Sequence, residues 1–233
     1  MAKITQEVID QRVQAATDFW KPRNDAFDEF ENIAFLEGFQ ADSSVEGVQT
    51  VISPEPQMFV KMMVGLLSSK LPQIRFIPVD ETDDNKKKAN IQESVCMGLL
   101  VTNNYMQEAS LVRLLSWCGV VFGWLCAKTV YNANPIEGQI PFLIQNINPK
   151  FVYPKFGKLG LIYAVEKYER TVGDVVSEWP KFEDKFGTNP DQTGDYVEYW
   201  DREIKYVKFQ GTELLKPSAH AYGFIPYSFG FAE

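Results

Sequence analysis

The sequence predicts an α+β protein with a helical N-terminal half and a β-rich, mainly antiparallel C-terminal half that contains one small helix. Two features of the 233-residue chain support this prediction. Up to about residue 123, apolar residues recur at the three- and four-residue spacing of helices. Beyond it, short segments rich in β-branched and aromatic residues alternate with turn-forming residues. We therefore expect a helical region over 1–123 and a β-rich region over 124–233.

The first 40 residues have a helical pattern that a proline interrupts. Since Pro22 lies inside the pattern, we expect either two helices or one kinked helix. Gly38 is a suitable stop for the second part, because glycine adopts the backbone conformation that ends helices. Residues 40–53 are typical of a loop followed by a short extended segment.

The next part of the chain predicts three more helices. Residues 53–72 begin with a serine and prolines and become rich in Met and Leu, which indicates a buried helix that ends before Pro72. After a short strand or extended connection at 73–79, a helix is expected over about 83–105, with acidic residues at its start. Its apolar face carries Ile91, Val95, Leu99 and Thr102. The segment 107–122 is almost entirely apolar in its second half, so we expect a helix buried on most sides.

Five segments of the second half have the composition of strands. They are "WLCAKTVYN", "IPFLIQNIN", "LIYAVEKYE", "DYVEYWD" and "EIKYVKFQG". The glycine pair at 156–160 indicates a hairpin turn. A small helix is expected to begin at Thr171 and to end at Pro180.

The strand "DYVEYWD" has two chemically different faces. Side chains alternate along a strand, so one face carries Asp195, Val197, Tyr199 and Asp201 and the other carries Tyr196, Glu198 and Trp200. This separates Asp195 from Glu198, and we therefore expect no catalytic pair of carboxylates here.

The composition excludes several classes of protein. With 45% hydrophobic and 23% charged residues, the chain has enough apolar material for one large domain or two small ones. Its net charge is −8, and the one basic run, 86–88, follows four acidic residues, which disfavours a static grip on nucleic acid. A surface past which DNA slides remains compatible with this charge.

The N-terminus does not have the pattern of a signal peptide, and the apolar run 114–127 is shorter than a membrane span, so we expect no membrane insertion.

The residues that most often carry chemistry are few. The odd count of three cysteines, with no C-x-x-C spacing, is typical of reduced core residues in a cytoplasmic protein. The single histidine, His220, is expected to bond to the backbone in a turn, although a Cys–His dyad is formally possible. The sequence contains no phosphate-binding glycine loop and no G-x-S-x-G elbow. We therefore predict no catalytic residues, no cofactor and no metal.

The order of several short motifs is also informative. A "WKPRNDAF" helix precedes a helix that leads to "LPQIRFIPV", a long helix and the glycine-punctuated segment "SWCGVVFGWLCAKTVY". "INPKFVYP" follows, then "YAVEKYERT" with a small helix, "DYVEYWDREIKYVKFQG" and finally "HAYGFIPYSF". In this order, from about residue 15 to 229, the chain resembles the wing region of tailed-bacteriophage portal proteins.

Two motifs of that family have matching residues in this chain. One is an E-Y-W-type strand, and the other is a His-x-Tyr/Phe-Gly-x-Ile-Pro segment that closes the wing sheet. The matching residues are Glu198, Tyr199, Trp200, His220, Tyr222, Gly223, Ile225 and Pro226. The "INP" at 147–149 also matches a short Asp/Asn-Pro step of the family.

The resemblance implies a structural protein and no enzyme. It implies a subunit of a homo-oligomeric ring, usually of twelve copies, at the capsid vertex through which double-stranded genome DNA is packaged and ejected. The implied partners are other portal subunits, the major capsid and scaffold proteins, and, through parts that this sequence lacks, the terminase and neck or tail proteins. The DNA would pass through the channel without sequence-specific binding. The implied location is the virion, with the host cytoplasm during assembly, and no membrane is involved.

Portal chains are usually much longer than this one, because stem helices and a clip follow the closing segment. We therefore expect a chain that is truncated before the stem and clip. Two other interpretations remain. One is a different capsid connector or adaptor with the same order of helices and strands. The other is a small cytoplasmic hydrolase that uses Cys118, Cys126, His220 or carboxylates.

Overall fold

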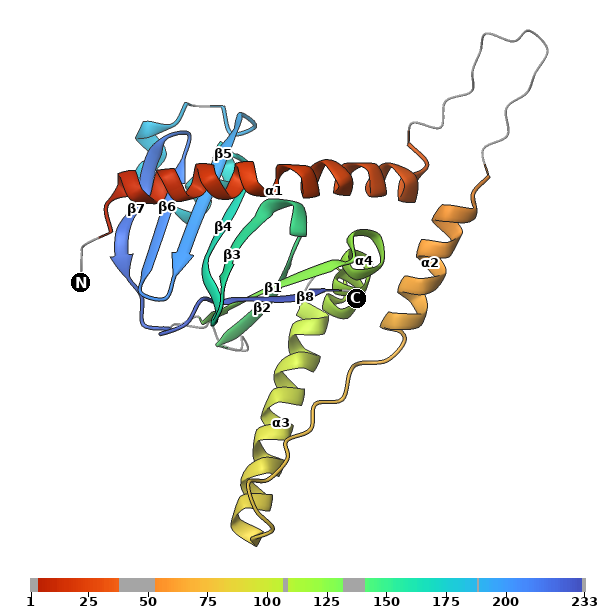
Figure 1. Cartoon of the computed structure of the whole chain (residues 1–233). Coiled ribbons are helices and arrows are strands. Elements are labelled where there is room, and N and C mark those ends of the chain that lie inside the picture. The colour runs from red at the N-terminus through yellow and green to blue at the C-terminus, as the bar shows by residue number, and fades with distance from the viewer. Residues whose placement is uncertain (1–3, 38–52, 107–108, 132–140, 188, 232–233) are drawn as a thin grey trace, which may run out of the picture. The chain divides into compact units, whose positions relative to one another are not determined.

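The computed structural model describes residues 4–37, 53–106, 109–131, 141–187 and 189–231. The α-helices are α1 (Gln6–Phe35), α2 (Glu55–Ser68), α3 (Asp83–Met106), α4 (Leu111–Phe122) and α5 (Val172–Glu178), and the 3-10 helices are η1 (Pro149–Phe151) and η2 (Pro180–Lys185) (Figure 1). The strands are β1 (Trp124–Tyr131), β2 (Phe142–Ile147), β3 (Val152–Gly157), β4 (Gly160–Thr171), β5 (Thr193–Asp201), β6 (Ile204–Phe209), β7 (Thr212–Ala219) and β8 (Tyr227–Phe231). The α+β prediction, with helices first and antiparallel strands after, is confirmed.

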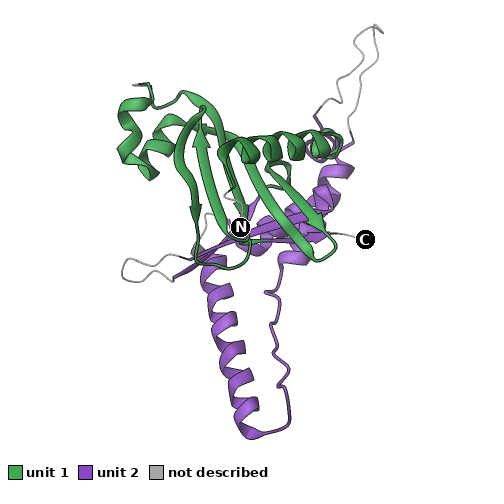
Figure 2. Cartoon of the chain, turned by 60° about the vertical axis from the view of Figure 1, so that its left-hand side comes forward, with its two compact units in different colours: residues 1–26, 148–227 green, residues 27–147, 228–233 purple. Residues whose placement is uncertain are grey.

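The chain forms two compact units, each built from separate parts of the sequence (Figure 2). Unit 1 comprises residues 1–26 and 148–227, and unit 2 comprises residues 27–147 and 228–233. The change from helix to strand at Gly123 therefore lies inside unit 2. It marks a change of local structure, whereas the units follow from packing between distant segments.

Unit 1 is centred on a five-stranded antiparallel sheet with the order β3-β4-β5-β6-β7. Because each strand pairs with the next one along the chain, short turns connect most neighbours. The turn predicted at 156–160 is confirmed: Gly157 pairs with Gly160, whose φ of 103° favours glycine. Gln210 and Gly211, with φ of 47° and 78°, form the two-residue turn between β6 and β7.

The first part of α1 covers one face of this sheet (Figure 1). Its buried residues Ile9, Val13 and Ala16 recur at helical spacing. They pack on Tyr153, Tyr163, Val165, Val197, Tyr199 and Tyr206. The opposite face carries a second cluster, formed by Val172, Val175, Phe186, Tyr196, Val207, Phe209 and Leu214. The predicted small helix is confirmed as α5, whose N-cap Thr171 accepts a hydrogen bond from the backbone N–H of Asp174.

Of the two alternatives expected at Pro22, the division into two helices is wrong, because α1 continues through this residue as one helix. A proline inside a helix costs about 3 kcal/mol, since it removes a hydrogen bond and crowds the preceding turn. Contacts on both sides of Pro22 offset that cost: Trp20 Nε1 donates to the carbonyl of Pro154 at 2.7 Å, and Arg23 Nη2 donates to the carbonyl of Val152 at 2.9 Å. The predictions for Gly38 and for residues 40–52 lie outside the described residues.

Unit 2 contains a three-stranded sheet with the order β2-β1-β8 and the helices α2, α3 and α4. Helix α4 begins at an N-cap serine, Ser110, and ends at Gly123, whose φ of 65° is the left-handed conformation of a helix stop. The fully buried Asn103 accepts a hydrogen bond from the backbone N–H of Ile144 at 2.7 Å and donates to the carbonyl of Phe142 at 3.1 Å. This side chain thus attaches the end of α3 to β2.

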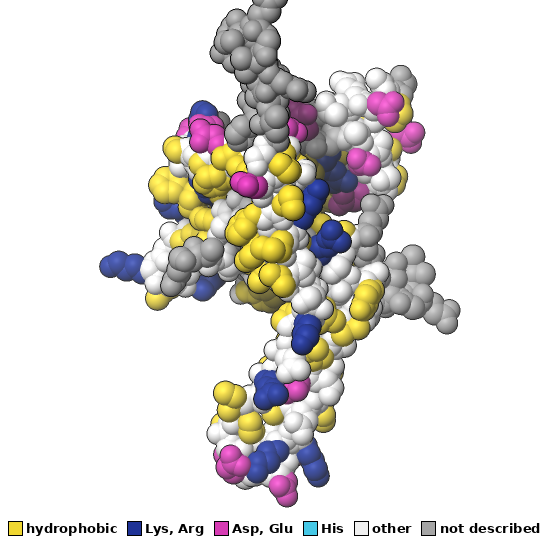
Figure 3. All heavy atoms as spheres, turned by 90° about the vertical axis from the view of Figure 1, so that its right-hand side faces the viewer, with side chains coloured by type: hydrophobic (Ala, Val, Ile, Leu, Met, Phe, Trp, Pro, Cys, Tyr) yellow, Lys and Arg dark blue, Asp and Glu magenta, His cyan; other side chains and the backbone are white. Residues whose placement is uncertain are grey.

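The prediction that residues 53–72 form a buried helix is only half right. The helix is present as α2, but Val64 is its one buried residue in the described structure, and with Val60 it faces α4 and neighbouring residues. The rest of its apolar surface is exposed, at Met58, Phe59, Met62, Leu66 and Leu67 (Figure 3). The apolar sequence of α2 predicts a buried helix. In the structure, the described residues of this chain cover only the side of α2 that carries Val64.

Helix α3 and the chain that precedes it form an arm of unit 2, which we define as residues 71–106 (Figure 1). The predicted helix over 83–105 is confirmed, whereas residues 73–79 form an extended connection and no strand. The connection runs beside α3, where the backbone N–H of Ile74 contacts Met97 Sδ at 3.4 Å. The arm exposes Ile77, Val79, Ile91, Val95 and Tyr105.

Candidate functional site

The E-Y-W motif on β5 divides its side chains between the two faces of the five-stranded sheet, as the strand alternation predicts. Glu198 and Trp200 lie on one face with Tyr196, because Glu198 accepts hydrogen bonds from Trp200 Nε1 at 2.6 Å and from the Tyr196 hydroxyl at 3.3 Å. Tyr199 lies on the other face, in the cluster beneath α1. The motif therefore serves two separate layers of unit 1.

The closing segment, residues 220–226, covers the Trp200 face of the sheet. The ring of Trp200, which is 3% exposed, lies 4.9 Å from that of His220 and 5.5 Å from that of Tyr222, measured between centroids. Gly223 has a φ of 69°, so the turn needs a residue that tolerates the left-handed conformation. Ile225 and Pro226 are buried after it. The structure thus brings together the motif residues Glu198, Trp200, His220, Tyr222, Gly223, Ile225 and Pro226, with Tyr199 on the far face.

His220 binds the backbone, as predicted from its position in a turn. Its Nε2 lies 2.9 Å from the carbonyl oxygen of Asp201, and its backbone N–H donates to the carbonyl of Glu203 at 3.0 Å. Since a carbonyl only accepts, Nε2 must carry the proton in this contact. His220 therefore joins the closing segment to the turn between β5 and β6.

Glu198 is the centre of a buried polar network. Besides its hydrogen bonds to Tyr196 and Trp200, it forms an ion pair with Lys205 at 3.1 Å. Lys205 also lies over the Trp200 ring, with Nζ at 4.7 Å from the centroid. Burial, and next the charge of Glu198, raises the pKa of the Tyr196 hydroxyl, which therefore remains a hydrogen-bond donor at neutral pH.

Glu166 lies beside this network, although no local pattern in the sequence singles it out. Glu166 pairs with Glu198 across β4 and β5, and it accepts a hydrogen bond from the Tyr227 hydroxyl at 2.5 Å. The register of the two strands sets this pairing. Glu166 and Glu198 are 4% and 5% exposed, so neither is accessible to a substrate in this conformation. The pair is a feature of the core and not an open catalytic dyad.

On the opposite face, Tyr199 connects the sheet to α1. Arg12 donates a hydrogen bond to the Tyr199 hydroxyl, which in turn donates to Asp201 Oδ2 at 3.1 Å. Arg12 also forms an ion pair with Asp201 at 3.7 Å. Asp201 Oδ1 accepts from the backbone N–H groups of Glu203 and Ile204 at 2.9 and 2.7 Å. These contacts orient the turn that follows the E-Y-W motif.

The "WKPRN" motif on α1 meets the "NPKFVYP" motif, although more than 120 residues separate them in the sequence. Arg23 Nη2 donates to the carbonyls of Pro149 and Val152 at 3.1 and 2.9 Å, and its guanidinium lies 4.5 Å from the centroid of the Trp20 ring. Asn24 Nδ2 donates to the carbonyl of Lys150 at 2.9 Å. The motif residues thus bind the backbone of a turn, which is a structural role.

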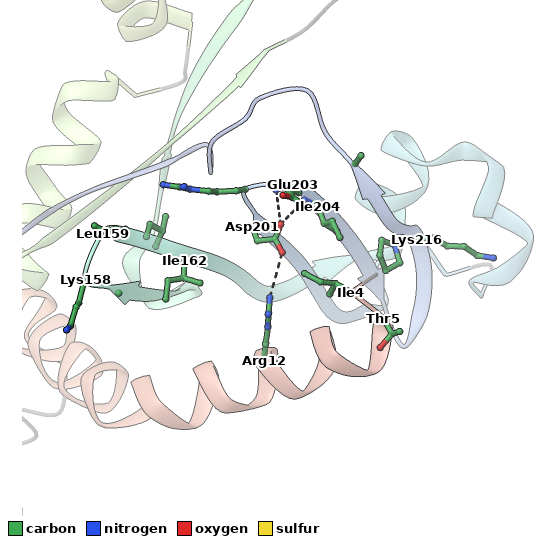
Figure 4. A pocket seen from close by; sticks show the side chains of 16 residues that line it. Ile4, Thr5, Arg12, Lys158, Leu159, Ile162, Asp201, Glu203, Ile204 and Lys216 are labelled. Atoms are coloured by element: carbon green, nitrogen blue, oxygen red, sulfur yellow. Dashed lines mark hydrogen bonds and ion pairs between the residues drawn. The ribbon is translucent and has the colours of Figure 1, made fainter. Parts of the chain in front are cut away.

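A cavity of about 1180 Å³ lies in unit 1, where the start of α1 meets two turns of the sheet (Figure 4). One is the β3–β4 turn at 158–159, and the other is the β5–β6 turn at 202–203. Arg12 reaches Asp201 across its floor, and Ile4 and Ile162 line it (Figure 4). Neither the cysteines nor His220 line this cavity.

The described residues provide no grouping of three or more His, Cys, Asp or Glu side chains that could hold a metal ion. In the part of the chain that the structure describes, no helix has both the length and the apolar character needed to cross a membrane.

Cys118 and Cys126 are buried and Cys96 is half-buried, and none of the three forms a disulfide. Burial raises the pKa of the Cys118 thiol to about 11, so this residue is a poor nucleophile at neutral pH.

We predict that Cys118 resists thiol reagents in the folded protein. With a pKa of about 11, roughly one molecule in a thousand carries the thiolate at pH 8. Brief treatment with iodoacetamide at pH 8, followed by peptide mass spectrometry, should modify Cys96 first and leave Cys118 unmodified. The same treatment in denaturant is the control and should modify all three cysteines. Modification of Cys118 at the rate of an exposed thiol would contradict this expectation.

Neither a scan against models of protein families nor a search of curated protein sequences finds a match to this chain.

Proposed function

We propose that this chain is the wing part of a portal subunit, that is, a structural subunit of the ring at the capsid vertex of a tailed bacteriophage. The order of its motifs, from "WKPRN" to "HAYGFIPYSF", supports the proposal. So do the contacts of the motif residues, which bind backbone and neighbouring side chains of the core. In this role the residues do no chemistry, and they hold the sheet and its closing turn in shape.

The observation that carries the proposal is the exposed apolar surface of α2. Met58, Met62 and Leu66 recur every four residues along one side of the helix and are 62%, 56% and 63% exposed. Phe59 and Leu67 extend the same surface. Contiguous exposed apolar surfaces of this kind are typical of sites that contact another protein, a membrane or a ligand, and in this proposal the contact is with another protein. A ring subunit buries such a surface against its neighbours.

The charge of the chain fits the passage of DNA. At a net charge of −8, the protein as a whole repels phosphates, which disfavours a tight static grip on DNA. A channel that holds DNA tightly would slow its packaging and ejection. In this proposal the capsid and scaffold proteins bind the ring, and the terminase and neck or tail proteins bind through other parts of a portal subunit, the stem and clip.

The proposal predicts assembly through α2. Native mass spectrometry and sedimentation velocity of the 26.6 kDa chain should show a closed ring of about twelve copies. The double variant Met62→Glu, Leu66→Glu should weaken assembly by about tenfold or more, because it places charges in an apolar contact. Lys61→Glu makes the same change in charge on the same helix without removing apolar surface, and it is the matched control. A chain that stays monomeric, or assembles equally well with the double change, would count against this function.

A further inference from the structure

The cavity of unit 1 is an apolar groove with a basic rim. Ile4, Leu161, Ile162 and Ile204 supply most of its apolar lining. Lys158, Arg202 and Lys216 lie along its edge and are exposed, and none of them forms an ion pair with the described residues. Two carboxylates also line the groove, Asp201 and Glu203. Asp201 is already engaged by Arg12 and by two backbone N–H groups, which leaves Glu203 as the one acidic side chain facing the three cations among these lining residues. The rim therefore has a surplus of positive charge in a protein whose net charge is −8.

The size of this groove favours a polypeptide as its occupant. At about 1180 Å³, it is larger than the roughly 300–1,000 Å³ of most small-molecule sites. It also opens between two turns, where Leu159 is 94% exposed and Ile162 is 48% exposed. An extended segment with apolar side chains and acidic neighbours would match both the lining and the rim.

The chain itself carries such a segment at the end of the arm of unit 2. Residues 77–84 read "IPVDETDD", with Ile77 and Val79 at 92% and 95% exposure. Four acidic residues follow within five positions. Glu81 and Asp84 form ion pairs with Lys86 and Lys88, which leaves Asp80 and Asp83 without a cation partner among the described residues. Asp80 instead accepts hydrogen bonds from the hydroxyl and the backbone N–H of Thr82, and the bond from the hydroxyl is the main cause of the lowered pKa of Asp80.

We propose that residues 77–84 of one copy of the chain bind in the unit 1 groove of the next copy. Ile77 and Val79 would bury their exposed side chains against the apolar lining, and Asp80 and Asp83 would face Lys158, Arg202 and Lys216. The contact joins two different surfaces of identical chains, so it repeats from copy to copy, and it forms a ring when the rotation between neighbouring copies closes. It rests on the proposed function, to which it adds a specific subunit contact.

Cross-linking between isotopically distinct copies tests this contact. A mixture of ¹⁴N- and ¹⁵N-labelled chains is assembled at low salt and treated with a carbodiimide, which joins carboxylates to lysines that touch. The expected product is a mixed-isotope peptide that joins Asp80 or Asp83 to Lys158 or Lys216. Cross-links between these residues within single-isotope chains only would place the segment in its own chain and overturn the proposal, and so would their absence.

A charge swap gives an independent readout. Lys158→Glu with Lys216→Glu should weaken association by about tenfold or more, and Asp80→Lys with Asp83→Lys should do the same, because each places like charges opposite one another. The combination of all four changes should restore most of the lost affinity. Lys181→Glu with Lys185→Glu, on exposed residues of η2 away from the groove, is the matched control and should leave association unchanged.

The outcomes separate this contact from the proposed function. If a ring forms but neither charge pair changes its stability, the contact is wrong and the portal proposal stands. If the wild-type chain remains monomeric at every concentration and yields no mixed-isotope cross-link, both are overturned. Loss of affinity in each charge pair with recovery in the combination supports the contact directly.

Discussion

Replacing Trp200 with alanine is expected to lower the free energy of unfolding by about 3–5 kcal/mol. The side chain is 3% exposed and contacts the rings of His220 and Tyr222. Its removal leaves a cavity beneath the closing segment and also removes the hydrogen bond that Trp200 Nε1 donates to Glu198. Denaturant unfolding followed by circular dichroism measures the loss. An unchanged unfolding midpoint would refute the placement of Trp200 in the core.

Two further variants separate the parts of this effect. Trp200→Phe retains an aromatic ring and removes the N–H donor, so we expect a smaller loss of about 1–3 kcal/mol. Trp179→Phe is the matched control, since Trp179 is half-buried and its Nε1 has no hydrogen-bond partner in the described structure. It should change the free energy of unfolding by less than Trp200→Phe does.

Replacing Glu198 with alanine is the second change with a large expected effect, again about 3–5 kcal/mol of lost stability. The carboxylate is 5% exposed and pairs with Lys205, and it accepts hydrogen bonds from Tyr196 and Trp200. Truncation leaves these buried donors and the cation without their acceptor, which costs more than the net value of the contacts themselves. The measurement is the same denaturant titration.

Glu198→Gln distinguishes charge from hydrogen bonding at this position. Glutamine retains a carbonyl acceptor for Trp200 while losing the ion pair with Lys205, so its cost should be well below that of alanine. Asp184→Ala, at an exposed residue of η2, is the control and should be within about 0.5 kcal/mol of the wild type. If Glu198→Ala behaved like this control, the buried network would not be stabilising the motif cluster.

Trp200 and Glu198 both contribute packing and hydrogen bonds to the centre of the motif cluster. Trp200 Nε1 donates a hydrogen bond to Glu198. His220 binds the backbone of Asp201 and packs against the Trp200 ring, so it attaches the closing segment to the sheet. The groove of unit 1 lies on the other side of β5, near Arg12 and Asp201. The proposed contacts with other copies therefore use α2, the arm and the groove, and not the motif cluster.

Most of the local structure could be predicted from the amino-acid sequence. The alternation along β5, the hairpin at 156–160, α5 with its Thr171 cap and α3 all follow from patterns within a few residues. These features are readable because backbone geometry sets the spacing of side chains along a helix or strand. The two faces of the E-Y-W strand were predictable for the same reason.

The contacts between distant residues and the solvent exposure of each surface could be seen only in the folded structure. The pairing of Glu166 with Glu198 depends on strand register, and the continuity of α1 through Pro22 depends on contacts that Trp20 and Arg23 make with β3. The exposure of α2 depends on how much of the chain packs against it, and an apolar pattern alone does not distinguish a core from an interface between subunits. Periodicity is a local property of the chain, whereas burial results from the packing of segments that are far apart in sequence.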